Sequence, residues 1–217
     1  DTDRSRGLGD VYKRQPQIIG KLALIIGVAY LGYLIHVVVV YGLSVTFLSK
    51  MNPITFFKGI APAMITAFTT TSSNATLPVN IECCNKMGAE PEISAFVLPL
   101  GATINMDGTA IYQAVAAVFI ACCYGIELTL GDMAMIVLTA TLASVGTAGT
   151  PGAGMIMLAM VLTQVNIPVA GIALIAGVDK LFDMGRTTLN ITGDATCALW
   201  ISRLEREKRS RQVKANK

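Results

Sequence analysis

The sequence has 217 residues, of which 53% are hydrophobic and 14% charged, and its mean hydropathy is +0.59. Soluble globular domains have about a quarter of charged residues, so this composition excludes an ordinary soluble protein and predicts an integral membrane protein. The net charge of +3 arises mainly in residues 203–217, which hold seven Lys/Arg and two Glu, and not in a basic patch that could bind nucleic acid. We therefore expect no nucleic-acid partner.

The chain begins with a polar segment followed by one long apolar span. Residues 1–16 have no hydrophobic period and lack the apolar core of a signal peptide, so we interpret them as a linker-like or non-native leader. The fold then covers residues 17–202. Residues 21–49 are almost entirely apolar, and a helix of about 40 Å over this span can cross a hydrocarbon core of about 30 Å. We predict one full transmembrane helix there and interpret His36 as part of its lining rather than as a ligand.

Two later segments share a different design, in which two apolar arms flank a polar tip. The first segment covers residues 53–87 and has the tip TTTSSNATLP (69–78). The second covers residues 128–166 and has the tip SVGTAGTPG (144–152). Such a tip cannot lie as a free loop in lipid, but it can line a cavity inside the protein. Because each arm is short for a full span, we predict two re-entrant helical hairpins.

Each predicted hairpin is followed by an interrupted apolar helix. The first of these covers residues 92–124 and is broken at 105–109, and the second covers residues 169–202. A hairpin plus a broken helix, occurring twice, indicates an internal repeat, and three full crossings give its two halves opposite orientations. This is the inverted-repeat arrangement of secondary transporters, whose sites lie near the midplane between discontinuous helices. The predicted fold class is therefore an all-α integral membrane protein.

A polar stripe runs along the last predicted helix. Its five residues, at spacings of i, i+4, i+7, i+11 and i+15, are Asp179, Asp183, Arg186, Asn190 and Asp194. At about 100° per residue they lie within about 80° of one another. A charged residue at the bilayer centre costs about 3 kcal/mol, so four of them facing lipid would cost about 12 kcal/mol. These side chains must face protein, water or a ligand.

The polar points of the sequence predict ligand chemistry. Residues 105–109 contain Asn, Asp and Gly, which are poor helix formers, and unwinding there would place free carbonyls beside Asp107 to suit a hard monovalent cation. The hairpin tips offer N–H groups and helix dipoles to a carboxylate. Arg186 can bind a second carboxylate with two parallel hydrogen bonds, Asp183 can hold an ammonium group, and Asp194 is free for a cation. The alternative interpretations are a kinked helix at residues 105–109, ordinary solvent-exposed turns at the two tips, and an internal ion-pair network on the last helix.

Four segments, in chain order, resemble the signature segments of a known family: TTTSSNATLP (69–78), LPLGATINMDGTAIYQ (98–113), SVGTAGTPGAG (144–154) and DMGRTTLNITGD (183–194). The family is that of the dicarboxylate/amino acid:cation symporters, which includes glutamate and aspartate transporters. The resemblance covers about residues 22–202 and corresponds to the family's sixth through eighth transmembrane helices. It implies sodium-coupled symport of an acidic amino acid by alternating access, with sodium ions co-transported, no organic cofactor and no enzymatic activity.

The resemblance also implies the residues of the sites. The substrate residues would be Thr71, Ser73, Met106, Thr109, Gly149, Thr150, Gly154, Asp183, Arg186, Thr187 and Asn190. Within this set, Asp183 would bind the substrate amine and Arg186 its side-chain carboxylate. The sodium residues would form three groups: Gly101, Asn105, Asn190 and Asp194; Thr103, Ser144, Val145 and Thr147; and Asn105 with Asp107.

The sequence departs from the family at two points. Many members have a second arginine at the position of Thr71 or of Met184, so we expect Asp183 to have no counter-ion. The family's first five helices, which include the oligomerisation scaffold, have no counterpart before residue 22. We therefore expect most of a transport domain, and a homotrimer when the chain is complete.

The resemblance and the basic tail together predict a location. We expect a multi-pass protein in contact with the lipid of a bacterial-type inner (plasma) membrane, with residues 203–217 as a cytoplasmic tail because basic segments favour that side. The alternatives are a C4-dicarboxylate or neutral amino acid symporter of the same family, an intramembrane aspartyl protease using Asp107 and Asp183, and a purely structural membrane subunit. A dicarboxylate without an amine leaves Asp183 unpaired, and a protease dyad needs neither Arg186 nor two hairpins.

Overall fold

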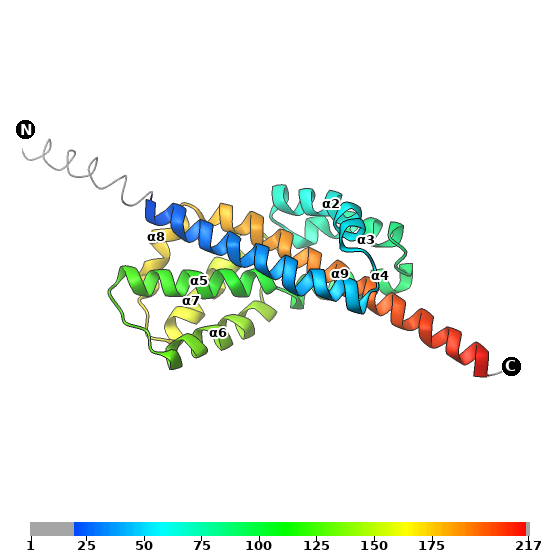
Figure 1. Ribbon diagram of the computed structural model, residues 1–217. Coiled ribbons are helices and arrows are strands. Elements are labelled where there is room, and N and C mark those ends of the chain that lie inside the picture. The colour runs from blue at the N-terminus through cyan, green and yellow to red at the C-terminus, as the bar shows by residue number, and fades with distance from the viewer. Residues whose placement is uncertain (1–19, 216–217) are drawn as a thin grey trace, which may run out of the picture.

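The computed structural model describes residues 20–215, and every regular element within them is helical. The expected leader, residues 1–16, lies outside the described residues. In chain order the elements are the N-terminal helix (Gly20–Leu48), α2 (Pro53–Thr70), α3 (Ser73–Lys86), α4 (Pro91–Ile104), α5 (Asp107–Cys123), α6 (Leu130–Val145), α7 (Ala153–Gln164), the short η3 (Val169–Ile172) and α8 (Ala173–Ala176), and α9 (Asp179–Ala215). Figure 1 shows the N-terminal helix beside α9, with the pairs α2–α3 and α6–α7 toward opposite ends of the molecule.

Both helix pairs begin and turn where local side chains satisfy the backbone. The Asn52 side chain caps α2 by accepting a hydrogen bond of 2.8 Å from the N–H of Ile54. The α2–α3 turn passes through Thr71, whose φ of 54° is in the left-handed region that non-glycine residues rarely adopt. In the second pair, Thr129 and Asp132 form a reciprocal capping box at the start of α6. The hydrogen bonds that Thr129 donates hold the pKa of Asp132 below its usual value.

The tips of the two helix pairs meet in the middle of the molecule. The Gly149 carbonyl accepts a hydrogen bond of 2.8 Å from the Ser72 hydroxyl and one of 3.2 Å from the Asn74 N–H. A Cβ atom at Gly149 would lie 2.9 Å from the Asn74 side chain and 3.0 Å from the Ala102 carbonyl oxygen. The approach therefore needs a residue without a side chain at this position. Two segments that are about 75 residues apart in the sequence thus close one shared space.

The last predicted segment, residues 169–202, is interrupted as expected. The interruption lies at residues 177–178, between α8 and α9, and the polar stripe is on continuous helix. The basic segment that begins at residue 203 continues α9 through Ala215 and projects beyond the body in Figure 1. Glutamates at positions 205 and 207 interspersed with basic residues allow i,i+3 and i,i+4 ion pairs along this extension.

The interior is divided into two hydrophobic clusters, and each of them combines early and late parts of the chain. One cluster joins the N-terminal helix, α5, α6 and α7, and includes Tyr112 and Leu158. The other joins α2, α3, α4 and the later part of α9, and includes Phe56 and Leu98. Because α9 contributes side chains to both clusters, it holds the two halves together.

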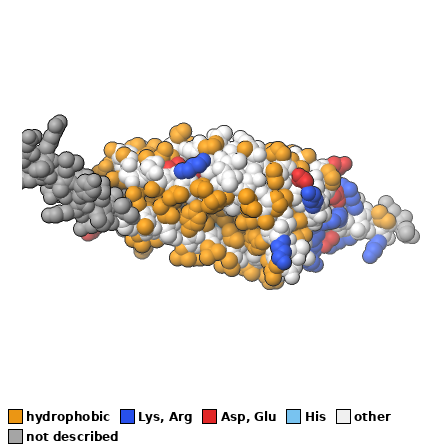
Figure 2. Space-filling model, turned by 90° about the horizontal axis from the view of Figure 1, so that it is seen from above, with side chains coloured by type: hydrophobic (Ala, Val, Ile, Leu, Met, Phe, Trp, Pro, Cys, Tyr) orange, Lys and Arg blue, Asp and Glu red, His pale blue; other side chains and the backbone are white. Residues whose placement is uncertain are grey.

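The outer surface is apolar over much of the molecule. Large side chains such as Leu24, Phe96 and Ile156 are about 70% exposed. Figure 2 shows hydrophobic side chains spread over the middle of the visible face and charged side chains gathered toward the C-terminal end. Within the described residues, two helical stretches are long and apolar enough to cross a membrane, Gly20–Leu48 and Pro91–Cys123. This surface is typical of a protein whose solvent is lipid.

Candidate functional site

The polar stripe of α9 faces the interior, as the spacing predicted. Its five side chains are all buried, with between 2% and 6% of their surface exposed: Asp179, Asp183, Arg186, Asn190 and Asp194. The neighbours on the opposite faces of this part of α9, such as Phe182 and Leu189, pack into the apolar clusters. The charged groups therefore avoid lipid, and each must be paired inside the protein or serve a ligand.

Arg186 is the centre of a buried charge cluster. Its Nε lies 2.9 Å from Asp183 Oδ1, and its Nη1 lies 3.5 Å from Asp179 Oδ1. The guanidinium also lies over the ring of Tyr112 at 4.5 Å, and the Tyr112 hydroxyl donates to Asp179 at 2.8 Å. The expectation that Asp183 has no counter-ion is wrong, because Arg186, one helical turn along, fills that role.

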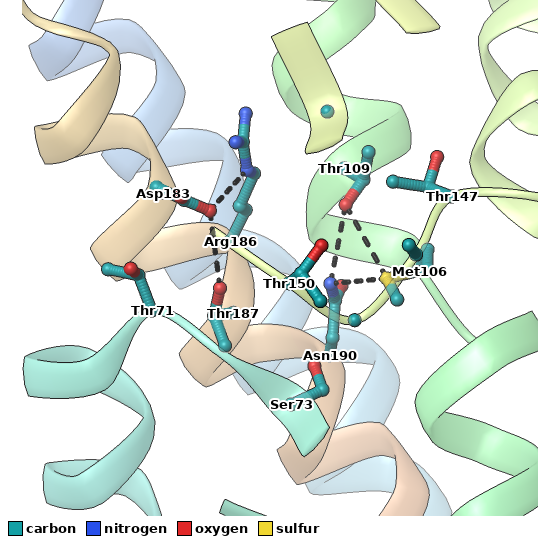
Figure 3. A pocket seen from close by; sticks show the side chains of 13 residues that line it. Thr71, Ser73, Met106, Thr109, Thr147, Thr150, Asp183, Arg186, Thr187 and Asn190 are labelled. Atoms are coloured by element: carbon teal, nitrogen blue, oxygen red, sulfur yellow. Dashed lines mark hydrogen bonds and ion pairs between the residues drawn. The ribbon is translucent and has the colours of Figure 1, made fainter. Parts of the chain in front are cut away.

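A polar pocket opens beside this cluster, between the two tips and the broken helix (Figure 3). It is lined by Thr71, Ser73, Met106, Thr109, Thr147, Ala148, Gly149, Thr150, Gly154, Asp183, Arg186, Thr187 and Asn190. The lining contains all eleven residues expected for the substrate. The space open to the centre of a water molecule is about 10 Å³, roughly what one water needs. An amino acid can enter only if part of the lining moves.

The second tip lies directly against the charge cluster. The N–H of Gly152 donates to Asp183 Oδ2 at 2.8 Å, and a Cβ atom at Gly154 would lie 2.7 Å from the Arg186 guanidinium. Glycine at position 154 thus lets the backbone approach the guanidinium, and Gly152 has a φ of 78°, which favours glycine. Among the described residues, Arg186 Nη2 is one of the few buried polar atoms without a hydrogen-bond partner. An unpartnered cationic N–H at the edge of a pocket is a donor for an incoming anion.

The break between α4 and α5 assembles the first expected group of sodium residues. The Asn105 amide donates to Asp194 Oδ1 at 2.9 Å and to the Asn190 carbonyl at 3.2 Å. The Asn190 side-chain oxygen in turn accepts from the N–H of Gly108 at 2.8 Å. A Cβ atom at Gly101 would lie 2.4 Å from Asp194 Oδ1, so the carboxylate is in close contact with the backbone of α4. Carboxylate and amide oxygens of this kind suit a hard cation.

Asp107 has partners that the sequence analysis missed. Its Oδ2 accepts from the Tyr41 hydroxyl at 2.7 Å and lies 3.2 Å from His36 Nε2. His36 is thus paired within the protein, and its interpretation as part of the helix lining rather than a ligand stays a prediction. Both partners come from the N-terminal helix, which has π-helical hydrogen bonding at 37–41 and 44–48. Such irregular turns often mark functional sites, but their sequence, VVVVY and SVTFL, has no feature that predicts them.

The other expected sodium residues are less closely grouped. Ser144 and Thr147 are buried at the second tip, but each hydroxyl donates to a carbonyl of the preceding helical turn. Thr103 is exposed on α4, with its hydroxyl donating to the Leu100 carbonyl, and the Val145 side chain is 47% exposed. Within the described residues, the side chains of Asn105 and Asp107 form no hydrogen bond with each other. These two groups stay predictions.

Sequence comparison shows which family has this arrangement. A family model for the sodium:dicarboxylate symporters matches residues 9–204. The chain belongs to this family. The sodium:dicarboxylate symporters are transporters and not enzymes, which agrees with the resemblance drawn from the four motifs.

Three relatives illustrate the similarity of this symporter chain to curated proteins. It is 46% identical over 199 residues to the sodium-dependent excitatory amino acid transporter glt-4 of Caenorhabditis elegans, covering 91% of this chain and 39% of the relative. It is 44% identical to excitatory amino acid transporter 1 of Homo sapiens, covering 89% and 36%. It is 45% identical to excitatory amino acid transporter 3 of Mus musculus, covering 82% and 34%. The chain thus spans a little over a third of the length of the relatives that it matches.

Proposed function

We propose that this chain forms the substrate- and sodium-binding part of a symporter for acidic amino acids, glutamate or aspartate, that works by alternating access in the plasma membrane. The observation that carries the proposal is the Arg186–Asp183 pair at the pocket where both tips meet α9. A guanidinium with an unpartnered N–H can bind a carboxylate, and the adjacent carboxylate can bind an ammonium group. An acidic amino acid carries both groups.

The binding mode that follows assigns one partner to each charged group of the substrate. Arg186 binds the side-chain carboxylate, Asp183 binds the amine, and the first tip at Ser73 receives the main-chain carboxylate. The remaining lining residues shape the pocket around these three points: Thr71, Met106, Thr109, Gly149, Thr150, Gly154, Thr187 and Asn190. Because Asp183 is now paired with Arg186, an incoming amine and carboxylate exchange partners with an existing ion pair. The exchange leaves no buried charge unpaired at either end.

Sodium ions bind beside the substrate in this proposal. The close grouping of Gly101, Asn105, Asn190 and Asp194 supports a first site. Asn190 belongs to both sets and joins the cation site to the substrate site through one side chain. The binding of sodium and the binding of substrate would be coupled there, because a sodium ion at Asp194 would fix the helix break whose other end lines the pocket.

The arrangement in the membrane is also part of the proposal. The four arms of the two helix pairs have 12 to 18 residues. At 1.5 Å per residue each is about 18 to 27 Å long, short of a hydrocarbon core of about 30 Å, which supports re-entrant hairpins. Each hairpin is followed by a broken helix, which supports an inverted repeat. We place the C-terminal end of α9 in the cytoplasm because it is basic, and we propose a homotrimer for the complete protein.

Uptake measurements test the proposal. Liposomes that hold the complete protein containing this sequence are given an inward sodium gradient and radiolabelled L-aspartate, L-glutamate or succinate. We expect sodium-dependent uptake of the two amino acids and much weaker uptake of succinate, which has two carboxylates but no amine for Asp183. Uptake of succinate above that of both amino acids would instead establish a dicarboxylate symporter. Uptake that is unchanged when sodium is replaced by choline would contradict the assignment.

A further inference from the structure

Lys180 is a second basic side chain beside the pocket, where it contacts the lining residue Thr71. Its Nζ donates to the Thr71 hydroxyl at 2.5 Å, so the lysine reaches from the first turn of α9 to the tip between α2 and α3. Thr71 itself is 1% exposed and lines the pocket, whereas Lys180 is exposed. The Thr71 hydroxyl donates in turn to the Thr70 carbonyl, which leaves its oxygen to accept from the ammonium group.

The distribution of basic residues makes this position unusual. Between Lys58 and Arg203 the sequence has only three basic residues: Lys86, Lys180 and Arg186. Lys86 is exposed at the far end of α3 and is paired with Glu82 at 2.6 Å. The other two both adjoin the pocket. In an apolar body, where each charged side chain is costly, two cations beside one pocket point to an anionic ligand.

The charges of the site leave room for a second cation. The buried cluster contains two carboxylates, Asp179 and Asp183, against one guanidinium, Arg186, for a formal charge of −1. An acidic amino acid brings a further −1. Arg186 can serve only one of the two substrate carboxylates with its free N–H, and the first tip contains no charged residue of its own from Thr69 to Pro78. A cation at the first tip offsets the second carboxylate.

We infer that Lys180 binds the main-chain carboxylate of the substrate at the first tip, with the Thr71 hydroxyl holding its ammonium group in place. The ammonium has three N–H donors, of which Thr71 accepts one. Thr71 also lines the pocket, so the lysine that it holds lies beside the space where the substrate binds. Arg186 then binds the side-chain carboxylate, and Lys180 binds the main-chain carboxylate. This inference rests on the proposed function of the site.

Two amides of aspartate distinguish the binding of one carboxylate from the binding of the other. L-Asparagine lacks the charge on the side-chain carboxylate, and L-isoasparagine, the α-amide, lacks the charge on the main-chain carboxylate. The half-inhibitory concentration of each compound, and of unlabelled aspartate, is measured against sodium-dependent uptake of radiolabelled L-aspartate by the complete protein. The variants are Lys180→Met, Lys180→Arg and Thr71→Val. Lys58→Met is the matched control, because Lys58 is an exposed lysine on α2 away from the tip.

The inference predicts a pattern across ligands and not a general loss. A charged hydrogen bond at a partly exposed site supports a loss of about 3- to 30-fold in the affinity of Lys180→Met for aspartate and asparagine. The affinity for isoasparagine should stay within about twofold, because that ligand has no main-chain charge to lose. Lys180→Arg should keep most of the wild-type discrimination, Thr71→Val should lose part of it, and Lys58→Met should resemble the wild type.

Three outcomes would overturn the inference, and they can be told apart. Equal weakening of aspartate and isoasparagine in Lys180→Met would show a structural role for the lysine, and unchanged affinities for all three ligands would show none at all. Either result leaves the proposed function standing if wild-type uptake of aspartate depends on sodium. Absence of aspartate uptake by the wild type would instead refute the proposed function and this inference with it.

Discussion

Replacement of Arg186 by cysteine tests the centre of the site most directly. The side chain is 2% exposed and is bound to Asp183 at 2.9 Å and to Asp179 at 3.5 Å. It also lies over Tyr112, and a Cβ at Gly154 would collide with it, so it fills the space between α5, α7 and α9. Arg186→Cys removes the cation and leaves two buried carboxylates without their partner.

Two magnitudes follow from this geometry. Removing one member of a buried ion pair costs about 3 to 5 kcal/mol of folding stability, because the remaining charge is left uncompensated. Removing the cation that binds a substrate carboxylate costs about 2 to 5 kcal/mol of binding, which corresponds to roughly 30- to 4000-fold in affinity. A small neutral amino acid has no side-chain carboxylate, so its binding should be spared the second loss.

The assay compares ligands within each variant to separate these effects. Sodium-dependent binding of L-aspartate and of L-serine is measured for the wild type, Arg186→Cys and Arg186→Lys, together with thermal unfolding in detergent. We expect Arg186→Cys to lose aspartate binding but to keep serine binding, and Arg186→Lys, which keeps a charge without the planar fork, to be intermediate. Unchanged aspartate affinity in Arg186→Cys would refute the assigned role of the guanidinium.

Three further predictions concern coupling, gating and topology. Gly101→Ala should raise the half-saturating sodium concentration at least about tenfold, because a Cβ 2.4 Å from Asp194 Oδ1 must displace that carboxylate. The control is Gly27→Ala, where a Cβ would have nothing within 4 Å, and it should leave the sodium titration unchanged. Spin labels across the second tip (146–152) and α9 should give a broad distance distribution without ligand and a narrow, short one with sodium and aspartate; motion of the first tip alone would contradict a gate at the second. A cysteine placed at Arg203 in a cysteine-free background should react only with reagents on the cytoplasmic side, and labelling from outside would reverse the proposed orientation.

Local pattern was sufficient for much of the fold. The apolar spans, the polar tips and the break at residues 105–109 are visible in the sequence because helix propensity and hydrophobic period act over a few residues. The break between Ile104 and Asp107 lies where Asn and Gly weaken the helix. The break before α9 was predicted only as lying within residues 169–202. It lies at Gly177 and Val178, where glycine weakens the helix, and the acids that follow are on regular helix.

The candidate site was also predictable from the sequence only in part. The stripe on α9 was predictable, because five residues on one helix share a face whatever lies opposite them. The partners that polar residues have on other helices were not predictable from spacing. Asp107 finds His36 and Tyr41 about 70 residues away, and Lys180 finds Thr71 at a separation of 109 residues. Neither Lys180 nor His36 lies in a sequence motif from which its partner could be identified.

The sequence by itself determined that the polar side chains of α9 lie inside the protein, because the cost of charge in lipid forces such groups to face protein, water or a ligand. Only the tertiary structure decided how those groups are paired with residues of other helices. The meeting of the two tips at Gly149, the hydrogen bond from the Gly152 N–H to Asp183 and the reach of Lys180 to the first tip each depend on how separate helices pack. In a dry interior the interaction between two charges depends steeply on the distance between them. Across helices that distance is set by how closely packed side chains fit together, and not by spacing along the chain.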